Sequence, residues 1–342
     1  MTTGMRRIAL LCAAAGLVLA SPAAAAQSWA QPQIAVVTAE GLMGGRASAF
    51  RPDDPLTWRE LTDLVTGLTG VEASPAADPG APATIVQLDA QLVRAIGLLP
   101  VAREFTAGIR AAGLTPPRSF GTEVVARLIG LRVNHPRAQD RLEPLPDDPA
   151  TRAEAAYSAA RILRFTGGEV DFVTRLADTF QPEALSDLQQ AVLQTAISLI
   201  GYPYVWGGTS ERPQDPFGTG KQVPGGFDCS GFVWRVFKLQ TYPGADTLPA
   251  TLKGRTTYAL SGEVPRAKRI PLAELQPADL VFFGAHGPRS KPAEVDHMGI
   301  YLGGGWFVHS SDQGVSLSPL TADWYAKRFA WGRRPLAEAN LE

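Results

Sequence analysis

The segment FDCSGFVWRVF, residues 227–237, restricts the fold most strongly because it places a cysteine where a helix is expected to begin. Four apolar residues in it recur at helical spacing and predict one buried helix face: Phe232, Val233, Val236 and Phe237. A cysteine on the first turn of a helix faces unpaired backbone N–H groups and the positive end of the helix dipole. Both favour the thiolate form, so the pattern predicts a reactive sulfur at Cys229.

Cys229 is the only cysteine outside an expected export signal. Residues 1–26 hold two arginines, an apolar run that contains Cys12, and a small-residue stretch suited to cleavage. The apolar run is short for a membrane span, so cleavage is expected and a retained anchor is the alternative. An exported protein with one unpaired thiol carries a buried filler, a bridge to another chain or a reactive group.

The charge balance excludes one class of partner. The chain has 32 Lys and Arg against 33 Asp and Glu, a formal net charge of −1. No broad basic surface is therefore available for nucleic acid or anionic lipid. A length of 342 residues suits two domains. We place their boundary near residue 180, which gives a signal at 1–26, one domain over 27–180 and a second over 181–342.

The first of these domains is expected to be mostly helical. PDDPLTWREL (52–61) and PDDPATRAEA (146–155) share Pro-Asp-Asp-Pro followed by Thr, with Glu three residues after the Thr. Thr57 and Thr151 are therefore expected to cap helices, each with a glutamate that reaches back in a capping box, Glu60 and Glu154. Two ordinary capped helices are the simplest interpretation of this repeat.

The approach to the first box adds a family resemblance. GLMGGRASAFRPDDPLTWREL (41–61) and PATRAEAAYSAARIL (149–163) resemble the surface-layer homology (SLH) repeat, with TIVQLDAQLVRAIGL (84–98) as a degenerate middle unit. In that family three such units pack together and bind cell-wall polymer. The resemblance implies an SLH-like wall-binding domain at the start of the mature chain.

This resemblance covers about residues 36–165 and carries over one site residue. Arg152 stands where SLH repeats place a polymer-contacting arginine, so the resemblance implies wall binding there. In the first unit that place is Trp58, with Arg59 next to it, which departs from the SLH pattern.

The second domain combines helices with paired strands. Helical spacing predicts a helix over 185–201. VDHMGIYLG (295–303) alternates like a strand, and GWFVHSS (305–311) is a second strand after a Gly-rich turn. A tight hairpin lays these strands side by side, which would put His297 and His309 on one face. One imidazole can then accept the cysteine proton while the other orients it.

These three side chains also allow simpler interpretations. A buried cysteine is often only a small apolar residue, and a strand histidine is often only hydrogen-bonded. A zinc site would need further ligands, and neither a compact Cys/His pair nor a fourth ligand stands out in the sequence. We therefore expect no metal and no cofactor, and we favour a nucleophile, a base and an orienting group.

Six blocks in a fixed order carry a second resemblance: GYPYVWGG (201–208), FDCSGFVWRVF, ADLVFFG (278–284), DHMGIYLG, FVHSS and RFAWGRR (328–334). They resemble the NlpC/P60 family of papain-like cysteine peptidases over about residues 186–335. The resemblance implies an α+β, papain-like core in which the helix with the cysteine packs on an antiparallel sheet. It also implies peptidase action on bacterial cell-wall peptides, typically at the bond after D-glutamate.

The NlpC/P60 resemblance assigns roles residue by residue. Cys229 is expected to be the nucleophile, His297 the base and His309 the orienting residue. Three further residues match the motifs: Tyr204, which would help the Cys229 N–H to hold the oxyanion; Asp228, a substrate-amine contact or a helix cap; and Ser230, a stem-peptide contact.

Two features depart from that family. Ala278 stands where a glycine is usual, a change that we expect to be tolerated. The loop over 209–226 is longer than the usual link, and it is expected to border the substrate cleft, to restrict access to it, or to be a plain surface excursion.

The sequence thus predicts an exported thiol hydrolase, secreted and wall-associated or periplasmic, without stable membrane insertion. Its expected partners are peptidoglycan stem peptides and, through the first domain, cell-wall polymer. A catalytically inactive wall-binding protein, and an amidase or acyl transferase that uses the same thioester, are the alternatives. A stabilised thiolate predicts alkylation of Cys229 well below pH 8.5.

Overall fold

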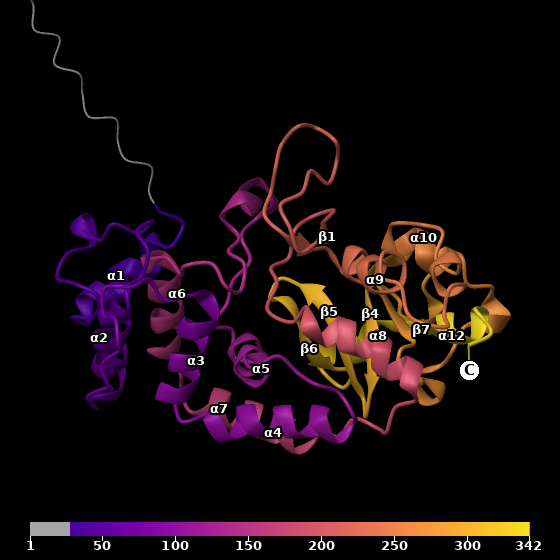
Figure 1. The fold of residues 1–342 in the computed structure, drawn as a ribbon, viewed down its shortest axis with the longest axis horizontal. Coiled ribbons are helices and arrows are strands. Elements are labelled where there is room, and N and C mark those ends of the chain that lie inside the picture. Colours follow the sequence, from indigo (N-terminus) through magenta and orange to yellow (C-terminus); the bar gives the residue numbers. More distant parts are fainter. Residues whose placement is uncertain (1–27, 342) are drawn as a thin grey trace, which may run out of the picture.

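The computed structural model describes residues 28–341, so the expected signal and Cys12 lie outside the described residues. The described chain has a helical part, drawn in indigo to magenta, followed by an α+β part in orange to yellow (Figure 1). This order confirms the fold class expected from the sequence.

The helical part contains seven α-helices among the described residues: α1 (Gln31–Ala39), α2 (Trp58–Thr69), α3 (Ile85–Ala95), α4 (Leu99–Ala111), α5 (Phe120–Leu128), α6 (Arg152–Ile162) and α7 (Gly168–Asp178). No single helix within residues 28–341 is long and apolar enough to cross a membrane. Only α3 and α4 taken together have the length and apolar composition of a membrane span, and they are bent by 118° relative to each other.

Three short segments that lead into α2, α3 and α6 close a ring of hydrogen bonds. The N–H of Leu56 donates to the carbonyl of Ala150 at 2.7 Å, that of Ala150 to Ala83 at 2.8 Å, and that of Ala83 to Leu56 at 2.8 Å. Each segment then reaches a threonine at the N-cap: Thr57, Thr84 and Thr151. The middle unit is therefore equivalent to the two that the sequence repeat shows.

Only one of the two predicted capping boxes forms completely. Thr57 accepts from the N–H of Glu60, whose carboxylate accepts from the N–H of Thr57 at 2.9 Å. Thr151 also caps α6, but the carboxylate of Glu154 pairs with Arg132 at 3.0 Å instead. The second box was a wrong prediction because a buried arginine from another segment competes for the same glutamate.

The α+β part begins with α8 (Asp187–Ser198), inside the predicted helix over 185–201. Its sheet is antiparallel with the strand order β6-β5-β4-β3-β7. The strands are β3 (Leu280–Gly284), β4 (Val295–Gly303), β5 (Trp306–Ser311), β6 (Gly314–Pro319) and β7 (Phe329–Arg333). Shorter helices complete this part: α10 (Thr257–Gly262), α11 (Asp323–Arg328) and α12 (Pro335–Glu338).

The helix α9 (Cys229–Phe237) packs on β4 and β5. Its four apolar residues predicted to be buried are all inaccessible to solvent. Gly231 permits the close approach of its first turn, because a Cβ atom at this position would clash with the carbonyl oxygen of Gly208. The sequence Cys-Ser-Gly therefore has a steric reason as well as a chemical one.

Ala278 adopts a φ of 71°, in the left-handed region that glycine reaches without strain. An L-residue there costs roughly 1–2 kcal/mol relative to a right-handed conformation. The alanine found where the family usually has glycine therefore adds local backbone strain two residues before β3 begins.

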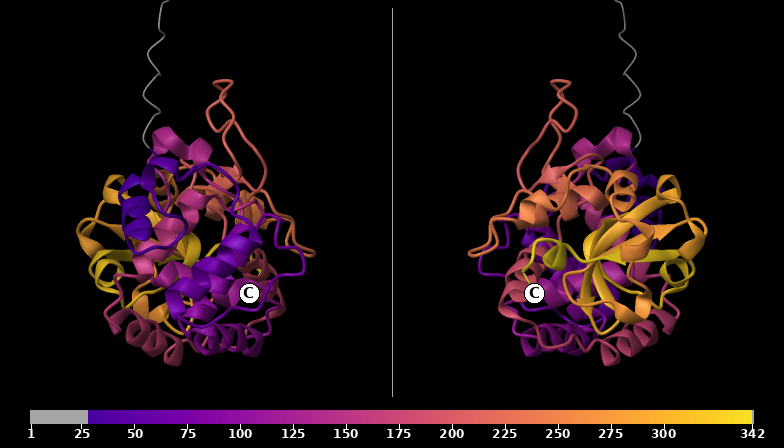
Figure 2. Two further views of the ribbon diagram at one scale, coloured as in Figure 1. Left: turned by 90° about the vertical axis from the view of Figure 1, so that its left-hand side faces the viewer. Right: turned by 90° about the vertical axis from the view of Figure 1, so that its right-hand side faces the viewer.

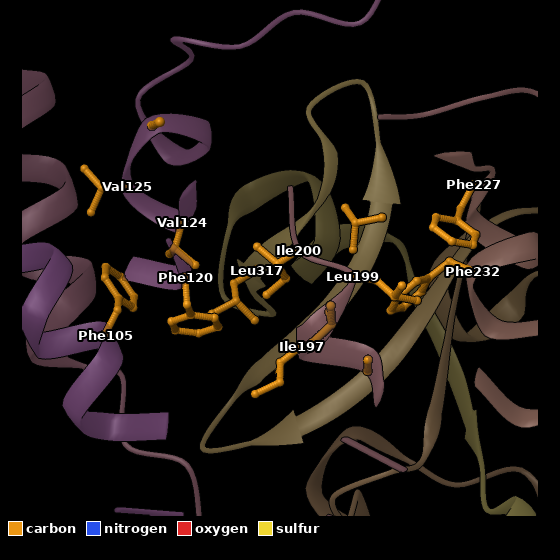
Figure 3. Close-up of a cluster of buried hydrophobic side chains, with 14 of the residues drawn as sticks. Phe105, Phe120, Val124, Val125, Ile197, Leu199, Ile200, Phe227, Phe232 and Leu317 are labelled. Carbon is orange, nitrogen blue, oxygen red and sulfur yellow. The ribbon is translucent and has the colours of Figure 1, made fainter. Parts of the chain in front are cut away.

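The two parts share one continuous apolar core (Figure 3). Phe105 and Phe120 of the helical part face Leu317 of β6 and Ile197 of α8. The ring of Trp306 in β5 lies 5.7 Å from that of Phe105 and 5.1 Å from that of Phe180, measured between centroids. The helical part is therefore packed against the sheet and is not held by a linker alone. The boundary near residue 180 stays a prediction.

The long loop stands out from the body of the molecule (Figures 1 and 2). Its base is a short antiparallel pair, β1 (Thr209–Ser210) and β2 (Gly226–Phe227). One end of it is tied to α9 by an ion pair between Glu211 and Arg235 at 2.7 Å. Phe217 is half exposed and lies over Gly207.

Candidate active site

The strands β4 and β5 stop pairing close to the first turn of α9. Among the described residues, β4 and β5 pair only from Gly303 to Ile300, which lies opposite Val308. His297 and Met298 lie on the part of β4 that pairs with β3, opposite Phe283 and Phe282, but not with β5. The N–H of Met298 donates to the sulfur of Cys229, so the first turn of α9 sits beside this part of β4.

The two histidines meet on one face, as predicted from the hairpin. Nε2 of His297 lies 3.0 Å from Nδ1 of His309, and Nε2 of His309 lies 2.9 Å from the hydroxyl oxygen of Ser318. The Tyr325 hydroxyl is 3.4 Å from the same Nε2. Gly299 makes room for this pair, since a Cβ atom there would lie 2.9 Å from Cβ of His309. Within residues 28–341, no group of three or more His, Cys, Asp or Glu could hold a metal ion.

Burial sets the protonation of the histidines. It lowers the pKa of His297 to about 4; the Asp296 carboxylate raises this pKa to a smaller extent, and the Arg328 guanidinium lowers it further. Burial, and then His297, hold the pKa of His309 well below 6.5. Both rings are therefore neutral at neutral pH, and each keeps one unprotonated ring nitrogen.

The same burial acts against the thiolate. Burial first and the Asp228 carboxylate second raise the pKa of the Cys229 thiol to about 11, although hydrogen bonds from Thr257 and Met298 lower it. The Cys229 sulfur is 3.3 Å from the Thr257 hydroxyl, and the cysteine is only 7% exposed. The helix N-terminus thus does not outweigh desolvation in the resting protein, contrary to the thiolate expected from the sequence.

Asp228 is the N-cap of α9. Its carboxylate accepts from the N–H groups of Gly231 and Gly207 and pairs with Arg255 at 3.1 Å. The Ser230 hydroxyl is buried between Asp228, at 3.0 Å, and Arg255, at 2.8 Å. These contacts brace the turn that holds the cysteine.

Tyr204 lies beside the cysteine, on the segment between α8 and the long loop. Burial and then Cys229 raise the pKa of its phenol above the usual value, so the hydroxyl is protonated. Tyr204 and His297 line a cavity of about 690 Å³. The other lining residues are Asn134, His135, Pro136, Ser311, Asp312, Trp324 and Tyr325.

Several residues of this site carried no signal in the sequence. Thr257, Ser318 and Tyr325 are single polar residues outside any motif, and Asn134 comes from the helical part. Neither spacing nor periodicity could have predicted them, because each reaches the site through tertiary packing.

Arg152 is engaged inside the helical part. Its guanidinium bonds to the carbonyls of Phe50 and Met43 and pairs with Glu60 of the neighbouring unit. The residue is 8% exposed, so these contacts join two units. Polymer contact by Arg152 stays a prediction. A groove of about 860 Å³ lies beside Trp58, between α2, the following loop and α3.

The model of the NlpC/P60 family matches residues 201–334. Residues 201–334 form an NlpC/P60 domain. The match covers the segment with Tyr204, α9 and all five strands of the larger sheet, and it leaves the helical part unmatched. No family model assigns the SLH-like units.

Curated relatives of the NlpC/P60 domain carry names of wall enzymes. The chain is 34% identical over 143 residues to "Probable peptidoglycan endopeptidase LytE" of Bacillus subtilis, covering 42% of this chain and 33% of the relative. It is 30% identical over 167 residues to "Murein DD-endopeptidase MepH" of Escherichia coli, covering 46% and 52%. The chain thus spans a third to about half of these relatives.

Among solved structures, the NlpC/P60 domain of the peptidoglycan hydrolase SagA is 28% identical, with a TM-score of 0.29, and covers 43% of this chain and 97% of its own. The peptidoglycan hydrolase RipB of Mycobacterium tuberculosis is 20% identical, with a TM-score of 0.32, and covers 71% and 89%.

Proposed function

We propose that this protein is an exported cysteine endopeptidase that cleaves peptidoglycan stem peptides, at the bond between D-glutamate and the diamino acid. The 3.0 Å contact of His297 with His309, beside the point where Met298 holds the Cys229 sulfur, carries the proposal. A nucleophile, a base and an orienting group are what acyl transfer through cysteine requires. The names of LytE and MepH support the substrate class.

In the proposed reaction, the Cys229 thiol gives its proton to Nδ1 of His297 as the sulfur attacks the peptide carbonyl. The C–N bond then breaks, His297 returns the proton to the leaving amine, and a thioester remains. Water attacks the thioester while His297 takes a proton from the water. The C–S bond then breaks to release the acid, and His297 returns the proton to the sulfur, which restores the thiol. Because burial disfavours either charge alone, the two groups exchange the proton only as a pair.

The hydrogen-bond chain behind His297 supports its role as base. If Nδ1 is to accept a proton, Nε2–H of His297 donates to Nδ1 of His309, and Nε2–H of His309 donates to Ser318. This chain holds one tautomer and one ring orientation, which is what an orienting residue contributes. Tyr204 and the backbone N–H of Cys229 are proposed to hold the oxyanion.

Asp228 is proposed to act through the helix turn and not on a substrate amine, since its oxygens are already bonded to Gly207, Gly231 and Arg255. Ser230 shares these partners. Its contact with the stem peptide stays a prediction that a substrate complex would test.

Digestion of defined muropeptides by the purified protein tests the proposal, with products identified by mass spectrometry. The wild type should release fragments cut after D-glutamate, and Cys229→Ala should release none. Loss of the sugar-linked L-alanine or transfer of the acyl group to an added amine would favour an amidase or acyl transferase. Intact muropeptides after wild-type digestion would favour an inactive wall-binding protein.

We further infer that the helical part is an SLH-like wall-binding module. The closed ring of three equivalent segments supports this inference, because three packed units are the arrangement that the resemblance implies. The groove beside Trp58 offers an aromatic ring together with Arg94 and Gln91, a lining suited to a polysaccharide. The same proposal places the mature protein at the wall or in the periplasm.

Cosedimentation with purified cell walls tests this binding in the inactive Cys229→Ala protein. Trp58→Ala should reduce the bound fraction severalfold, and Phe172→Ala, which changes a half-exposed aromatic residue of α7 that lines neither the groove nor the active-site cavity, should leave it close to that of the parent. Equal binding by all three proteins would exclude the groove as the polymer site.

A further inference from the structure

We propose that Asn134 of the helical part is a positioning residue for Tyr204, so that the helical part completes the active site. This inference rests on the proposed peptidase function and on the oxyanion role of Tyr204. It differs from a wall anchor, whose only contribution would be a higher concentration of enzyme near the substrate.

The backbone at Tyr204 belongs to no named strand, yet both of its sides are bonded. On one side, Phe227 donates to the carbonyl of Pro203 at 3.1 Å and accepts from Val205 at 3.3 Å. On the other side, the N–H of Tyr204 donates to Oδ1 of Asn134 at 3.1 Å, and Nδ2 of Asn134 donates to the carbonyl of Tyr204 at 2.7 Å. The side-chain amide of Asn134 thus takes the place of a neighbouring strand.

Asn134 also bonds to the hairpin that carries His309. Its backbone N–H donates to the carbonyl of Asp312, in the turn between β5 and β6, at 3.2 Å. One residue therefore links the segment of Tyr204 to the strand of the orienting histidine. A shift of Asn134 would move these two groups relative to each other.

The segment after Asn134 is built to stay in place. The carboxylate of Glu143 accepts from the backbone N–H of His135 and lies 3.0 Å from its Nδ1, with both side chains almost fully buried. Asp140 accepts from the N–H of Trp206, two residues beyond Tyr204. Because the turn is closed on itself and bonded again to the Tyr204 segment, it can serve as a rigid support.

Cation–π contacts of Arg137, in the same segment, add a third link to the helical part. The guanidinium carbon of Arg137 lies 5.4 Å from the ring centroid of Trp206 and 5.1 Å from that of Phe217, on the long loop. The helical part therefore contacts Tyr204, Trp206 and the long loop, and the contact with Tyr204 lies at the lining of the cavity that contains His297.

The test compares Asn134→Ala with Gln194→Ala, a matched control. The amide of Gln194 makes the same pair of bonds across the two parts, both at 2.8 Å to the backbone of Thr115, and neither Gln194 nor Thr115 lines the cavity. If Asn134 positions Tyr204, Asn134→Ala should lower kcat about 10- to 100-fold with little change in KM, since small misplacements in an active site cost rates of this order. Gln194→Ala should keep the wild-type kcat.

A double-mutant cycle with Tyr204→Phe separates positioning from general weakening. If Asn134 acts through Tyr204, Asn134→Ala should cause little further loss in the Tyr204→Phe protein. Iodoacetamide should alkylate Cys229 at the wild-type rate in Asn134→Ala, because this reaction uses no oxyanion site. Asn134→Asp keeps the bond from the Tyr204 N–H and should give an intermediate kcat, and it replaces the alanine variant if that variant does not fold.

Two outcomes would overturn the inference while leaving the peptidase in place. One is a wild-type kcat in Asn134→Ala, and the other is a loss that multiplies with that of Tyr204→Phe. A wild-type protein that cleaves no stem peptide would instead overturn the proposed function, and the inference with it.

Discussion

At the scale of single residues, desolvation outweighs the helix terminus around the sulfur of Cys229, the proposed nucleophile. Cys229 has the capped first turn that favours a thiolate, yet burial raises its pKa to about 11 and lowers that of His297 to about 4. The resting pair is therefore a neutral thiol and a neutral imidazole. In the proposed reaction, the two groups become charged together as the sulfur attacks the substrate.

These pKa directions predict the pH dependence of activity. The base must be unprotonated, and burial keeps His297 unprotonated down to about pH 4. We expect kcat/KM to stay level from pH 8 to pH 5 and to fall as the pH drops through about 4. Circular dichroism at each pH separates this loss from unfolding, and an acid limb centred near 6.5 would contradict a buried base.

The same depressed pKa values affect stability. As the pH falls, the unfolded chain takes up protons on these histidines near pH 6.5, before the folded protein does. The free energy of unfolding should therefore be highest above pH 6.5 and should decrease as the pH falls towards 4.

Alkylation of Cys229 should be slow at pH 7 and should accelerate as the pH rises, because burial holds the thiol protonated.

At the scale of elements, the position of α9 depends on the absence of a side chain. Gly231 faces the carbonyl of Gly208 across the turn that precedes the long loop, and a methyl group at this position has no room. The capping carboxylate of Asp228 and the ion pair with Arg255 hold the same turn from the other side. The close packing of Gly231 and the ion pair of Asp228 with Arg255 thus hold the first turn of α9 together.

Gly231→Ala should therefore destabilise the protein by about 2 kcal/mol or more, the order of magnitude for overpacking in a tight site. Gly262→Ala is the control, since a Cβ atom there would make ordinary contact with Pro292 at 3.5 Å. The control should change the free energy of unfolding by less than about 1 kcal/mol. Urea unfolding curves give both values, and equal stability of the two variants would contradict the assigned role of Gly231.

At the scale of the whole molecule, the helical part and the sheet are one packed body. Trp306 of β5 contacts Phe105 and Phe180, and Asn134 of the same helical part bonds to Tyr204. An apolar core that crosses between the parts couples their stabilities. A module added only for wall binding would not need such a core.

Trp306→Ala should lower the stability of both parts together, by about 3–5 kcal/mol as for other large-to-small changes in a core. Far-UV circular dichroism, dominated by the helical part, and near-UV circular dichroism of the sheet aromatics should show one coincident transition. Trp324→Ala, at a residue that is 48% exposed, should cost much less. Two separate transitions in the wild type would show that the parts unfold independently.

The sequence by itself determined the local structure and the chemistry of three side chains. Periodicity predicted α8, α9, β4 and β5, and the hairpin brought His297 and His309 within 3.0 Å. These features follow from neighbours along the chain, where spacing dictates which face a residue occupies.

Tertiary structure alone decided the protonation of the sulfur, the loss of one capping box to Arg132, and the support of Tyr204 by Asn134. Each depends on how completely water is excluded from a group, or on which side chain from a distant segment binds the group in the folded structure. Neither quantity is encoded in local spacing, because both are set when segments far apart in the chain pack together.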